Sequence, residues 1–333
     1  MSAYSVTRRG LLGTAVALVA AGAGWPGRGA AADKVRMACW SQPISEQANV
    51  FAAQEFGWFR EQGLDFEFVP GAGGGEALKH LLAGNADFAF TNVEPILFGV
   101  EQGAQVQAVY NIYPKNVFNV VSLKSKNITR PQDLKGKRVG VYSMASGTRH
   151  NLLAILHSVG VREAEVEVVA TGVLAFGPLM AGQVDATAAT DTGLWAARQK
   201  GLGEVNVIWA KEYLDTPTDV FVVRAETAEK QPDFVTRFLR AYRKGSQWML
   251  DNPEKAADLA ARHATDGQDV QRNLEIIRLR NASSISEGTK KHGLGWFDMD
   301  ILRRAEKTYV ELGLLKKSVD VDAIFTNRFV QEL

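Results

Sequence analysis

The feature that most constrains the fold is a nine-residue pattern that occurs twice. Leu81–Ala89 reads LLAGNADFA, and 98 residues further on Leu179–Thr187 reads LMAGQVDAT. In both copies a helical run ends at a glycine, and an aspartate then precedes an apolar run typical of a buried strand. The repeat predicts two α/β lobes whose strands end at equivalent positions around one crevice, where open α/β sheets bind ligands. The alternative is that a common helix-to-strand device arose twice without a shared site.

Strand-like and helix-like segments alternate around both copies of this pattern. Leu64–Val69 and Val184–Ala189 are typical of strands, whereas Ile44–Phe56 and Thr148–Ser158 have helical periodicity. Such alternation predicts the α/β class, with mostly parallel sheets that carry helices on both faces.

The order of the segments also predicts how the lobes are connected. Residues 33–121 and 219–333 are expected to form the first lobe, which includes the C-terminal helices, and residues 122–218 the second lobe. The chain then crosses between the lobes twice, near Val117–Lys124 and near Thr218–Val223. Two crossings make a hinge, and this favours closure of the lobes on a ligand.

A glycine-rich loop follows the strand-like Leu64–Val69. Gly71–Glu76 contains four glycines and leads into a helical segment, so that unpaired backbone N–H groups would point out of the helix start. These N–H groups can donate to an oxyanion, although the glycines can equally serve a turn that needs positive φ. A dinucleotide fingerprint is excluded because Glu76 stands at the third glycine position, and a phosphate-binding P-loop is excluded because no Gly-Lys-Ser/Thr follows.

Composition excludes several classes of protein. The 333 residues are 46% hydrophobic and 23% charged, which is a globular composition with room for two domains. The single cysteine, Cys39, rules out an internal disulfide framework and a cysteine-cluster metal site. The five histidines lack metal-ligand spacing, and without a long basic run no nucleic-acid surface is expected.

The N-terminal segment resembles an export signal. Arg8-Arg9 precedes a short apolar stretch, and Ala30–Ala32 resembles a small-residue cleavage site. Residues 1–32 are therefore expected to be a signal peptide of the twin-arginine type, cleaved near Ala32, and the mature protein is expected in the periplasm. The alternative is an uncleaved membrane anchor.

Polar and aromatic residues follow the predicted strand ends in both lobes. Hydroxyls and amides there can hydrogen-bond a ligand, aromatic rings can stack on it, and Ser146–Thr148 begins a helix that can hold an anion. Glu94 and Asp191 would instead meet an amine or a ring N–H. Each residue also has an ordinary role as a cap, turn or core residue, and core packing fits Phe118 better. The candidate ligand-binding residues are Trp40, Gln42, Gly73, Gly74, Gly75, Thr91, Asn92, Glu94, Tyr142, Ser143, Ser146, Gly147, Thr148, Thr190 and Asp191.

The export signal and three segments of the chain together resemble one family. Phe56–Leu64, Leu82–Asp87 and Asp133–Val141 are similar to segments of the solute-binding proteins of nitrate/sulfonate/taurine-type ABC importers, including the thiamine-precursor-like branch. The resemblance implies the type II periplasmic-binding-protein fold, with two lobes, mixed sheets and two hinge crossings. It also implies a receptor that closes on a small ligand and delivers it to a permease and its ATPase at the inner membrane. The protein is expected to be a monomer.

The function expected from these features is ligand binding and not catalysis. The chain shows no Ser-His-Asp order, no metal spacing and no nucleophile elbow, and it implies no cofactor. The expected ligand is a sulfonate, a carboxylate or a pyrimidine-like heterocycle. Two alternatives stay open: an enzyme on the same fold that forms or converts a pyrimidine precursor, and a periplasmic ligand sensor.

Overall fold

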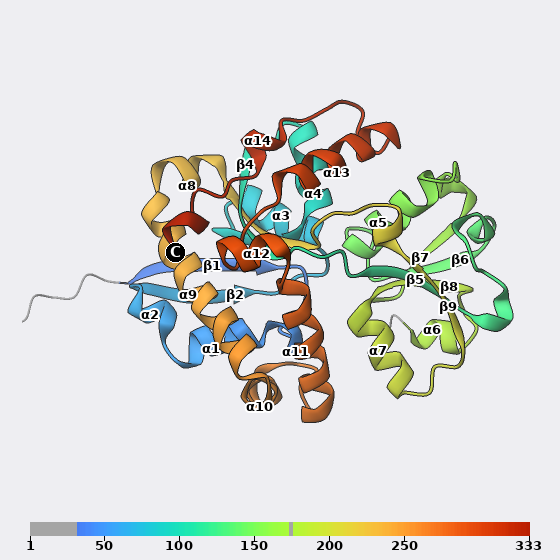
Figure 1. Ribbon diagram of the computed structural model, residues 1–333, viewed down its shortest axis with the longest axis horizontal. Helices are drawn as coiled ribbons and strands as arrows, with labels where there is room; N and C mark the ends of the chain where they lie inside the picture. The colour runs from blue at the N-terminus through green and yellow to red at the C-terminus, as the bar shows by residue number, and fades with distance from the viewer. Residues whose placement is uncertain (1–31, 173–175) are drawn as a thin grey trace, which may run out of the picture. The chain divides into compact units, whose positions relative to one another are not determined.

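The computed structural model describes residues 32–172 and 176–333, which carry two five-stranded sheets (Figure 1). The predicted signal peptide lies outside these residues, except for Ala32. We call the residues around the first sheet the first lobe and those around the second sheet the second lobe. In spatial order the first sheet holds β2 (Leu64–Val69), β1 (Asp33–Cys39), β3 (Phe88–Asn92), β10 (Asp219–Arg224) and β4 (Val106–Tyr113). The second sheet holds β7 (Glu167–Ala170), β6 (Arg138–Val141), β8 (Ala186–Thr190), β5 (Phe118–Leu123) and β9 (Val205–Trp209).

The two sheets have the same topology. In each, the first three strands are parallel, and the fourth strand, β10 or β5, is antiparallel to both of its neighbours. Each sheet is therefore mixed, and the predicted two-lobe α/β architecture is confirmed.

Each antiparallel strand is the first strand that the chain forms after crossing from the other lobe. β5 pairs with β8 and β9 along its length, so it lies wholly in the second sheet although the predicted lobe boundary between residues 121 and 122 falls inside it. The outward crossing is therefore residues 114–117, between β4 and β5, and the return crossing leads from β9 into β10.

The repeated sequence pattern has one structural role in both lobes. Gly84 and Gly182 have φ of 75° and 69°, a conformation that glycine adopts without strain, and each ends a helix. The Asp87 carboxylate then accepts the backbone N–H of Arg36 at 2.9 Å, and the Asp185 carboxylate accepts that of Arg138 at 3.1 Å. Each aspartate thus fixes the register of a parallel strand against its neighbour, which explains why the pattern recurs.

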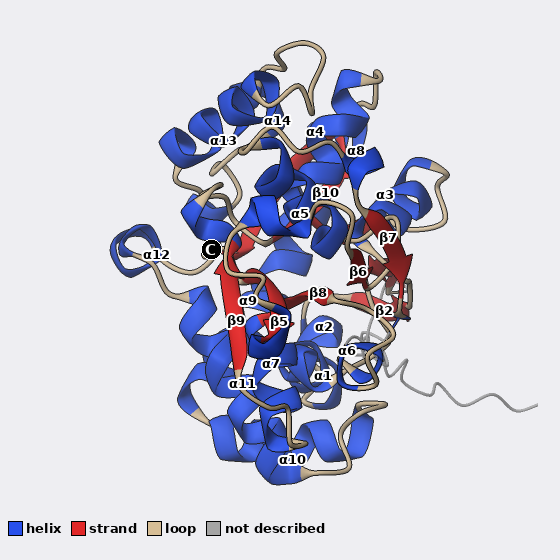
Figure 2. Cartoon of the chain, turned by 90° about the vertical axis from the view of Figure 1, so that its right-hand side faces the viewer, coloured by secondary structure: helices blue, strands red, loops and turns tan. Residues whose placement is uncertain are grey.

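Helices cover both sheets, as Figure 2 shows. In chain order they are α1 (Ala48–Glu55), α2 (Trp58–Glu61), α3 (Gly74–Leu82), α4 (Val93–Glu101), α5 (Gly147–His157), α6 (Gly177–Met180), α7 (Asp191–Gln199), α8 (Ala225–Lys230), α9 (Pro232–Asp251), α10 (Pro253–His263), α11 (Val270–Ser284), α12 (Glu287–His292), α13 (Met299–Glu311) and α14 (Val321–Ile324). A short 3-10 helix, η1 (Ser45–Gln47), precedes α1.

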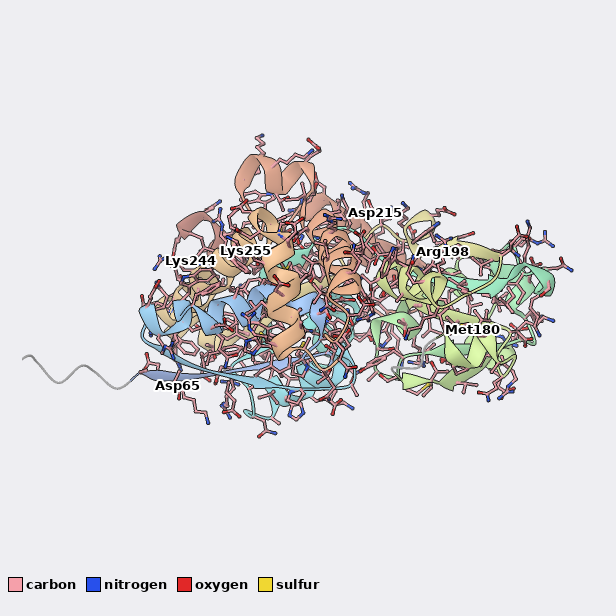
Figure 3. The ribbon with its side chains drawn as sticks, turned by 90° about the horizontal axis from the view of Figure 1, so that it is seen from below. Asp65, Met180, Arg198, Asp215, Lys244 and Lys255 are labelled. Atoms are coloured by element: carbon pink, nitrogen blue, oxygen red, sulfur yellow. The ribbon has the colours of Figure 1, made fainter. Side chains whose placement is uncertain are left out.

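Charged side chains lie on the outer faces of these elements. Asp65 on β2, Arg198 on α7, Lys244 on α9 and Lys255 on α10 are all exposed (Figure 3). Among the described residues, none of the helices combines the length and the apolar character that a membrane span requires.

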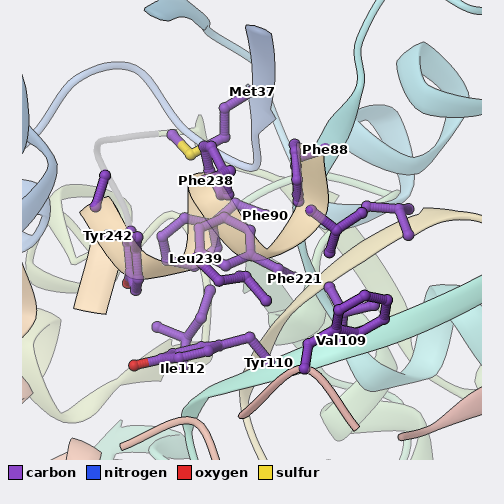
Figure 4. Packing of buried hydrophobic residues seen from close by; sticks show 14 of the residues in the cluster. Met37, Phe88, Phe90, Val109, Tyr110, Ile112, Phe221, Phe238, Leu239 and Tyr242 are labelled. Carbon is purple, nitrogen blue, oxygen red and sulfur yellow. The ribbon is translucent and has the colours of Figure 1, made fainter. Parts of the chain in front are cut away.

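The core of the first lobe is built on aromatic side chains from the sheet and α9 (Figure 4). Phe238 of α9 stacks on Phe88 of β3 with ring centroids 3.8 Å apart, and Tyr242 meets Phe221 of β10 edge-on at 4.6 Å. All four side chains are buried, and each such burial stabilises the fold by about 1.5–3 kcal/mol. The second lobe has smaller, mostly aliphatic clusters on the two faces of its sheet, one under α5 and one under α7.

Candidate ligand-binding site

A cavity of about 50 Å³ lies where the carboxyl ends of β1 and β3 meet those of β6 and β8. Both lobes and the two crossings line it, as expected for a ligand site of open α/β sheets. The lining residues are Trp40, Glu46, Gly73, Gly74, Asn92, Val117, Phe118, Tyr142, Ser146, Gly147, Thr148, Thr190, Thr218, Asp219 and Arg280.

Two helices begin at glycines on opposite sides of this cavity. α3 starts at Gly74 in the first lobe and α5 at Gly147 in the second, so their positive dipole ends are both at the site. A Cβ on Gly74 would lie 2.5 Å from the Asn92 Oδ1, and a Cβ on Gly147 would lie 2.5 Å from the Phe118 ring. Both positions therefore require glycine, because any side chain would collide with the wall of the cavity.

The glycine-rich loop is already engaged by backbone groups. The Gly73 N–H donates to the Trp40 carbonyl at 2.7 Å, and the Gly75 N–H donates across the lobes to the Ala145 carbonyl at 3.0 Å. The Ser143 hydroxyl donates in the opposite direction, to the Ala72 carbonyl at 2.6 Å. In this conformation the loop joins the lobes, and two of the three N–H groups predicted to hold an oxyanion have other acceptors.

Aromatic rings from the two lobes meet in the cavity wall. Trp40 follows β1 and Tyr142 follows β6, and their rings make an edge-to-face contact with centroids 6.4 Å apart. Within the described residues, the buried Trp40 indole N–H has no hydrogen-bond partner. Trp40 therefore offers a flat apolar surface and one donor to a bound molecule.

A buried charge cluster forms another part of the wall. Arg280 of α11 is 1% exposed; its Nε donates to Glu46 of η1 at 2.7 Å, and its Nη2 donates to Asp191 of α7 at 2.7 Å and to Thr192 at 2.8 Å. Burial alone would lower the pKa of Arg280, but the two carboxylates outweigh it and raise the pKa above its usual value. The guanidinium is therefore a permanent positive charge between two carboxylates of different lobes.

Asp219 is, with Glu46, one of the two carboxyl groups that line the cavity. It is 3% exposed and accepts a hydrogen bond from the Asn92 Nδ2 at 2.5 Å. Burial raises the pKa of Asp219 well above its usual range, while Arg280 and the Asn92 amide oppose that shift less strongly. Depending on pH, Asp219 offers a ligand either an acceptor or an O–H donor.

Nine of the fifteen predicted residues line the cavity and six do not. Gln42 is exposed, and Thr91 is buried behind Gly74, donating to its carbonyl at 2.7 Å. Those that line the cavity are Trp40, Gly73, Gly74, Asn92, Tyr142, Ser146, Gly147, Thr148 and Thr190. Those that do not are Gln42, Gly75, Thr91, Glu94, Ser143 and Asp191.

Glu94 has a different environment from the one predicted. It is fully buried, and the Asn151 amide of α5 donates to its Oε1 at 2.7 Å. Burial raises the pKa of Glu94 to about 7, although the hydrogen bond from Asn151 acts in the opposite direction. Glu94 therefore belongs to a contact between the lobes and not to the cavity wall.

The sequence prediction missed several lining residues. Asp219 could have been found from the sequence, because it is an acidic residue directly before the apolar run Val220–Val223 of β10. Arg280 had a weaker signal, since it shares a buried helical face with Asn273 and Ile277 of α11. The missed residues are Glu46, Val117, Phe118, Thr218, Asp219 and Arg280.

The segment of the chain that matches a known family contains most of the residues around the cavity. The family model described as "NMT1/THI5 like" matches residues 44–256, which is more than half of the chain. The chain belongs to the NMT1/THI5-like family. The match includes Asp219 and Glu46 but ends before Arg280.

The proteins and solved structures that are similar to this chain differ in function. The riboflavin-binding protein RibY of Chloroflexus aurantiacus is 27% identical over 246 residues, 73% of this chain and 70% of that protein. The 4-amino-5-hydroxymethyl-2-methylpyrimidine phosphate synthase THI12 of Saccharomyces cerevisiae is 23% identical over 241 residues, 67% of this chain and 69% of that protein. The structure of the periplasmic aliphatic sulphonate binding protein SsuA from Escherichia coli superimposes with a TM-score of 0.65 at 18% identity, covering 90% of this chain and 99% of SsuA. The fold is that of periplasmic binding proteins.

Proposed function

We propose that this protein is the substrate-binding component of an ABC importer, which closes its two lobes on a small organic ligand and delivers it to a membrane permease. The observation that carries the proposal is the cavity itself, which both lobes line at the carboxyl ends of their parallel strands. Ligand-binding proteins among its relatives and structural neighbours support the same function.

The size of the cavity supports a cycle of opening and closing. Ligand sites commonly enclose roughly 300–1,000 Å³, whereas this cavity has about 50 Å³. Because hydrogen bonds such as Gly75 to Ala145 join the lobes across it, a ligand enters only when the lobes separate. The two crossings are the natural hinge for that movement.

The lining favours one of the three expected ligand classes. Trp40, Tyr142 and Phe118 provide apolar ring surface, and the unpaired Trp40 N–H calls for an acceptor on the ligand. An ionised Asp219 would accept a hydrogen bond from an N–H of the ligand, and a protonated Asp219 would donate one to an acceptor on the ligand. A flat heterocycle with both donors and acceptors meets these demands better than a free sulfonate or carboxylate, which would face the carboxyl groups of Glu46 and Asp219.

Export to the periplasm is part of the proposal. The twin-arginine segment at the N-terminus supports it, as does the periplasmic location stated for SsuA. In that compartment the protein would act as a monomer that meets a permease and its ATPase at the inner membrane.

A second candidate function is synthesis of a pyrimidine precursor. The similarity to the yeast synthase favours it, and the two functions differ in what happens to the bound molecule.

The test is to identify that molecule and follow its fate. The exported protein is purified without denaturation, and the ligand is released by unfolding and identified by mass spectrometry. The released ligand is then added back to refolded protein. Saturable binding, return of the ligand with unchanged mass, and contraction in small-angle scattering are expected. A changed mass supports the synthase, and a failure to bind any recovered compound overturns both functions.

A further inference from the structure

The contacts of Arg280 reach across the cleft, which distinguishes it from the other charged residues at the cavity. Arg280 and Glu46 belong to the first lobe, and Asp191 and Thr192 begin α7 of the second lobe. Helices α11 and α7 pack against each other at this point. The guanidinium therefore sits at a place where the two lobes touch.

Each nitrogen of the guanidinium donates at least one hydrogen bond, to the other lobe or to its own. The Nε donates to Glu46 and the Nη2 donates to Asp191 and Thr192, while the Nη1 donates to Ser283 at 3.4 Å. The Tyr113 ring lies under it, 5.4 Å from centroid to guanidinium carbon.

Thr192 completes the cluster as a closed network. Its hydroxyl donates to the second carboxylate oxygen of Glu46 at 2.7 Å while it accepts from Arg280. Both carboxylates are thus bound to the Arg280 guanidinium, and Glu46 is also bound to the Thr192 hydroxyl. Charge-assisted hydrogen bonds are stronger than those between neutral groups, and a buried charge that loses its partner is strongly unfavourable.

We propose that Arg280 is a positioning residue that holds the lobes together over the cavity by binding Asp191 and Thr192 of the second lobe while Glu46 anchors it in the first. When the lobes separate, Arg280 gives up Asp191 and Thr192 but keeps Glu46. The cluster therefore sets the balance between open and closed lobes. The inference extends the proposed closure, yet it concerns contacts that exist whatever the ligand is.

Asp191 gives the sharpest test because it touches Arg280 but does not line the cavity. If Arg280 served only as a ligand contact, removing the charge of Asp191 would leave lobe closure unchanged. If Arg280 positions the lobes, the Asp191→Asn variant opens them.

The experiment measures the distance between the lobes by pulsed electron-spin resonance. Spin labels are placed at Lys255→Cys in the first lobe and Arg198→Cys in the second, two exposed positions (Figure 3). The native Cys39 is fully buried and stays unlabelled. The protein is unfolded, stripped of small molecules and refolded, and native circular dichroism confirms that each variant folds. Glu212→Gln, an exposed charge loss in the second lobe, is the matched control.

The expected result is a ratio of closed to open lobes that falls at least about tenfold in Asp191→Asn and stays at the wild-type value in Glu212→Gln. Thr192→Val removes the hydroxyl and leaves every charge, so it should lower the same ratio by a smaller factor. This variant provides the test if Asp191→Asn does not fold. Identical distance distributions in the wild type, in Thr192→Val and in Asp191→Asn where it folds would overturn the proposal. The proposed import function would survive that result, because it depends on ligand recovery and not on this distance.

Discussion

The amide of Asn151 in the second lobe donates to the carboxylate of Glu94 in the first lobe, with 2.7 Å between Nδ2 and Oε1. The Asn151 Oδ1 accepts in turn from Asn116 in the outward crossing at 3.0 Å, and Asn116 also donates to the Leu214 carbonyl near the return crossing. One chain of hydrogen bonds thus connects both lobes and both crossings, and Glu94 is its only acidic member.

Glu94 makes stability depend on pH. Burial raises its pKa to about 7, so the folded protein binds this proton more tightly than the unfolded chain does. The free energy of unfolding should therefore fall as pH rises between the unfolded and folded pKa values, by up to about 1.4 kcal/mol per pH unit. Urea unfolding from pH 5 to pH 8 measures this slope.

The Glu94→Gln variant is the control for that slope. It should be less sensitive to pH than the wild type over the same range. Some dependence should remain, because burial also raises the pKa of Asp219 and acts in the same direction. Parallel curves for the wild type and Glu94→Gln would show that Glu94 does not titrate in this way.

Trp40 and Asn92 should contribute directly to ligand affinity. Trp40 supplies ring surface and a free N–H, and Asn92 orients Asp219 in the cavity wall. Trp40→Ala and Asn92→Ala should each weaken binding of the recovered ligand at least tenfold, or about 1.4 kcal/mol. Titration calorimetry measures the effect, with Lys255→Ala on the outer surface as the control. Unaltered affinity in both variants would place the ligand elsewhere.

Gly147 should tolerate no side chain when the lobes are closed. A Cβ there would lie 2.5 Å from the Phe118 ring and 2.8 Å from the Asn92 side chain of the other lobe. Gly147→Ala should therefore reduce ligand affinity at least about tenfold by holding the lobes apart. Gly203→Ala is the matched control, because a Cβ at Gly203 meets no atom within 4 Å. Equal affinities for the two variants would contradict the close approach.

The single thiol should be inert in the folded protein. Cys39 is fully buried, and that burial raises the pKa of its thiol to about 12. Because the thiolate is the reactive form, iodoacetamide should modify Cys39 at neutral pH only after unfolding. Mass spectrometry of alkylated protein, with and without urea, measures this. Rapid modification without urea would show that the strand β1 opens in the native state.

Much of the fold could be predicted because its signals are local. In the repeated Gly-x-x-Asp pattern the glycine (Gly84 or Gly182) ends a helix, and the aspartate (Asp87 or Asp185) fixes the register of the next strand. The strand ends that follow, Asn92 and Thr190, were placed at the cavity for the same reason.

The remaining parts of the site depend on contacts between distant segments. Arg280 reaches the cavity only because α11 packs against η1 and α7, and no short stretch of sequence records that packing. Glu94 was misplaced for a related reason: it follows a strand end, as a ligand contact would, but the register of α4 turns it toward Asn151. Sequence position identified the correct edge of each sheet but not the direction of every side chain.

The place of β10 in the first sheet also determines the order in which the chain can be assembled during synthesis. β10 lies between β3 and β4 and hydrogen-bonds to both, yet it begins only at Asp219, after every strand of the second sheet has been made. The last strand of the second sheet ends at Trp209, so this sheet has all its strands while the first sheet still lacks the strand between β3 and β4. Truncated chains that end before Asp219 should therefore hold a complete second lobe and an unfinished first lobe, and the ribosome must release the last third of the chain before the first lobe can close its core.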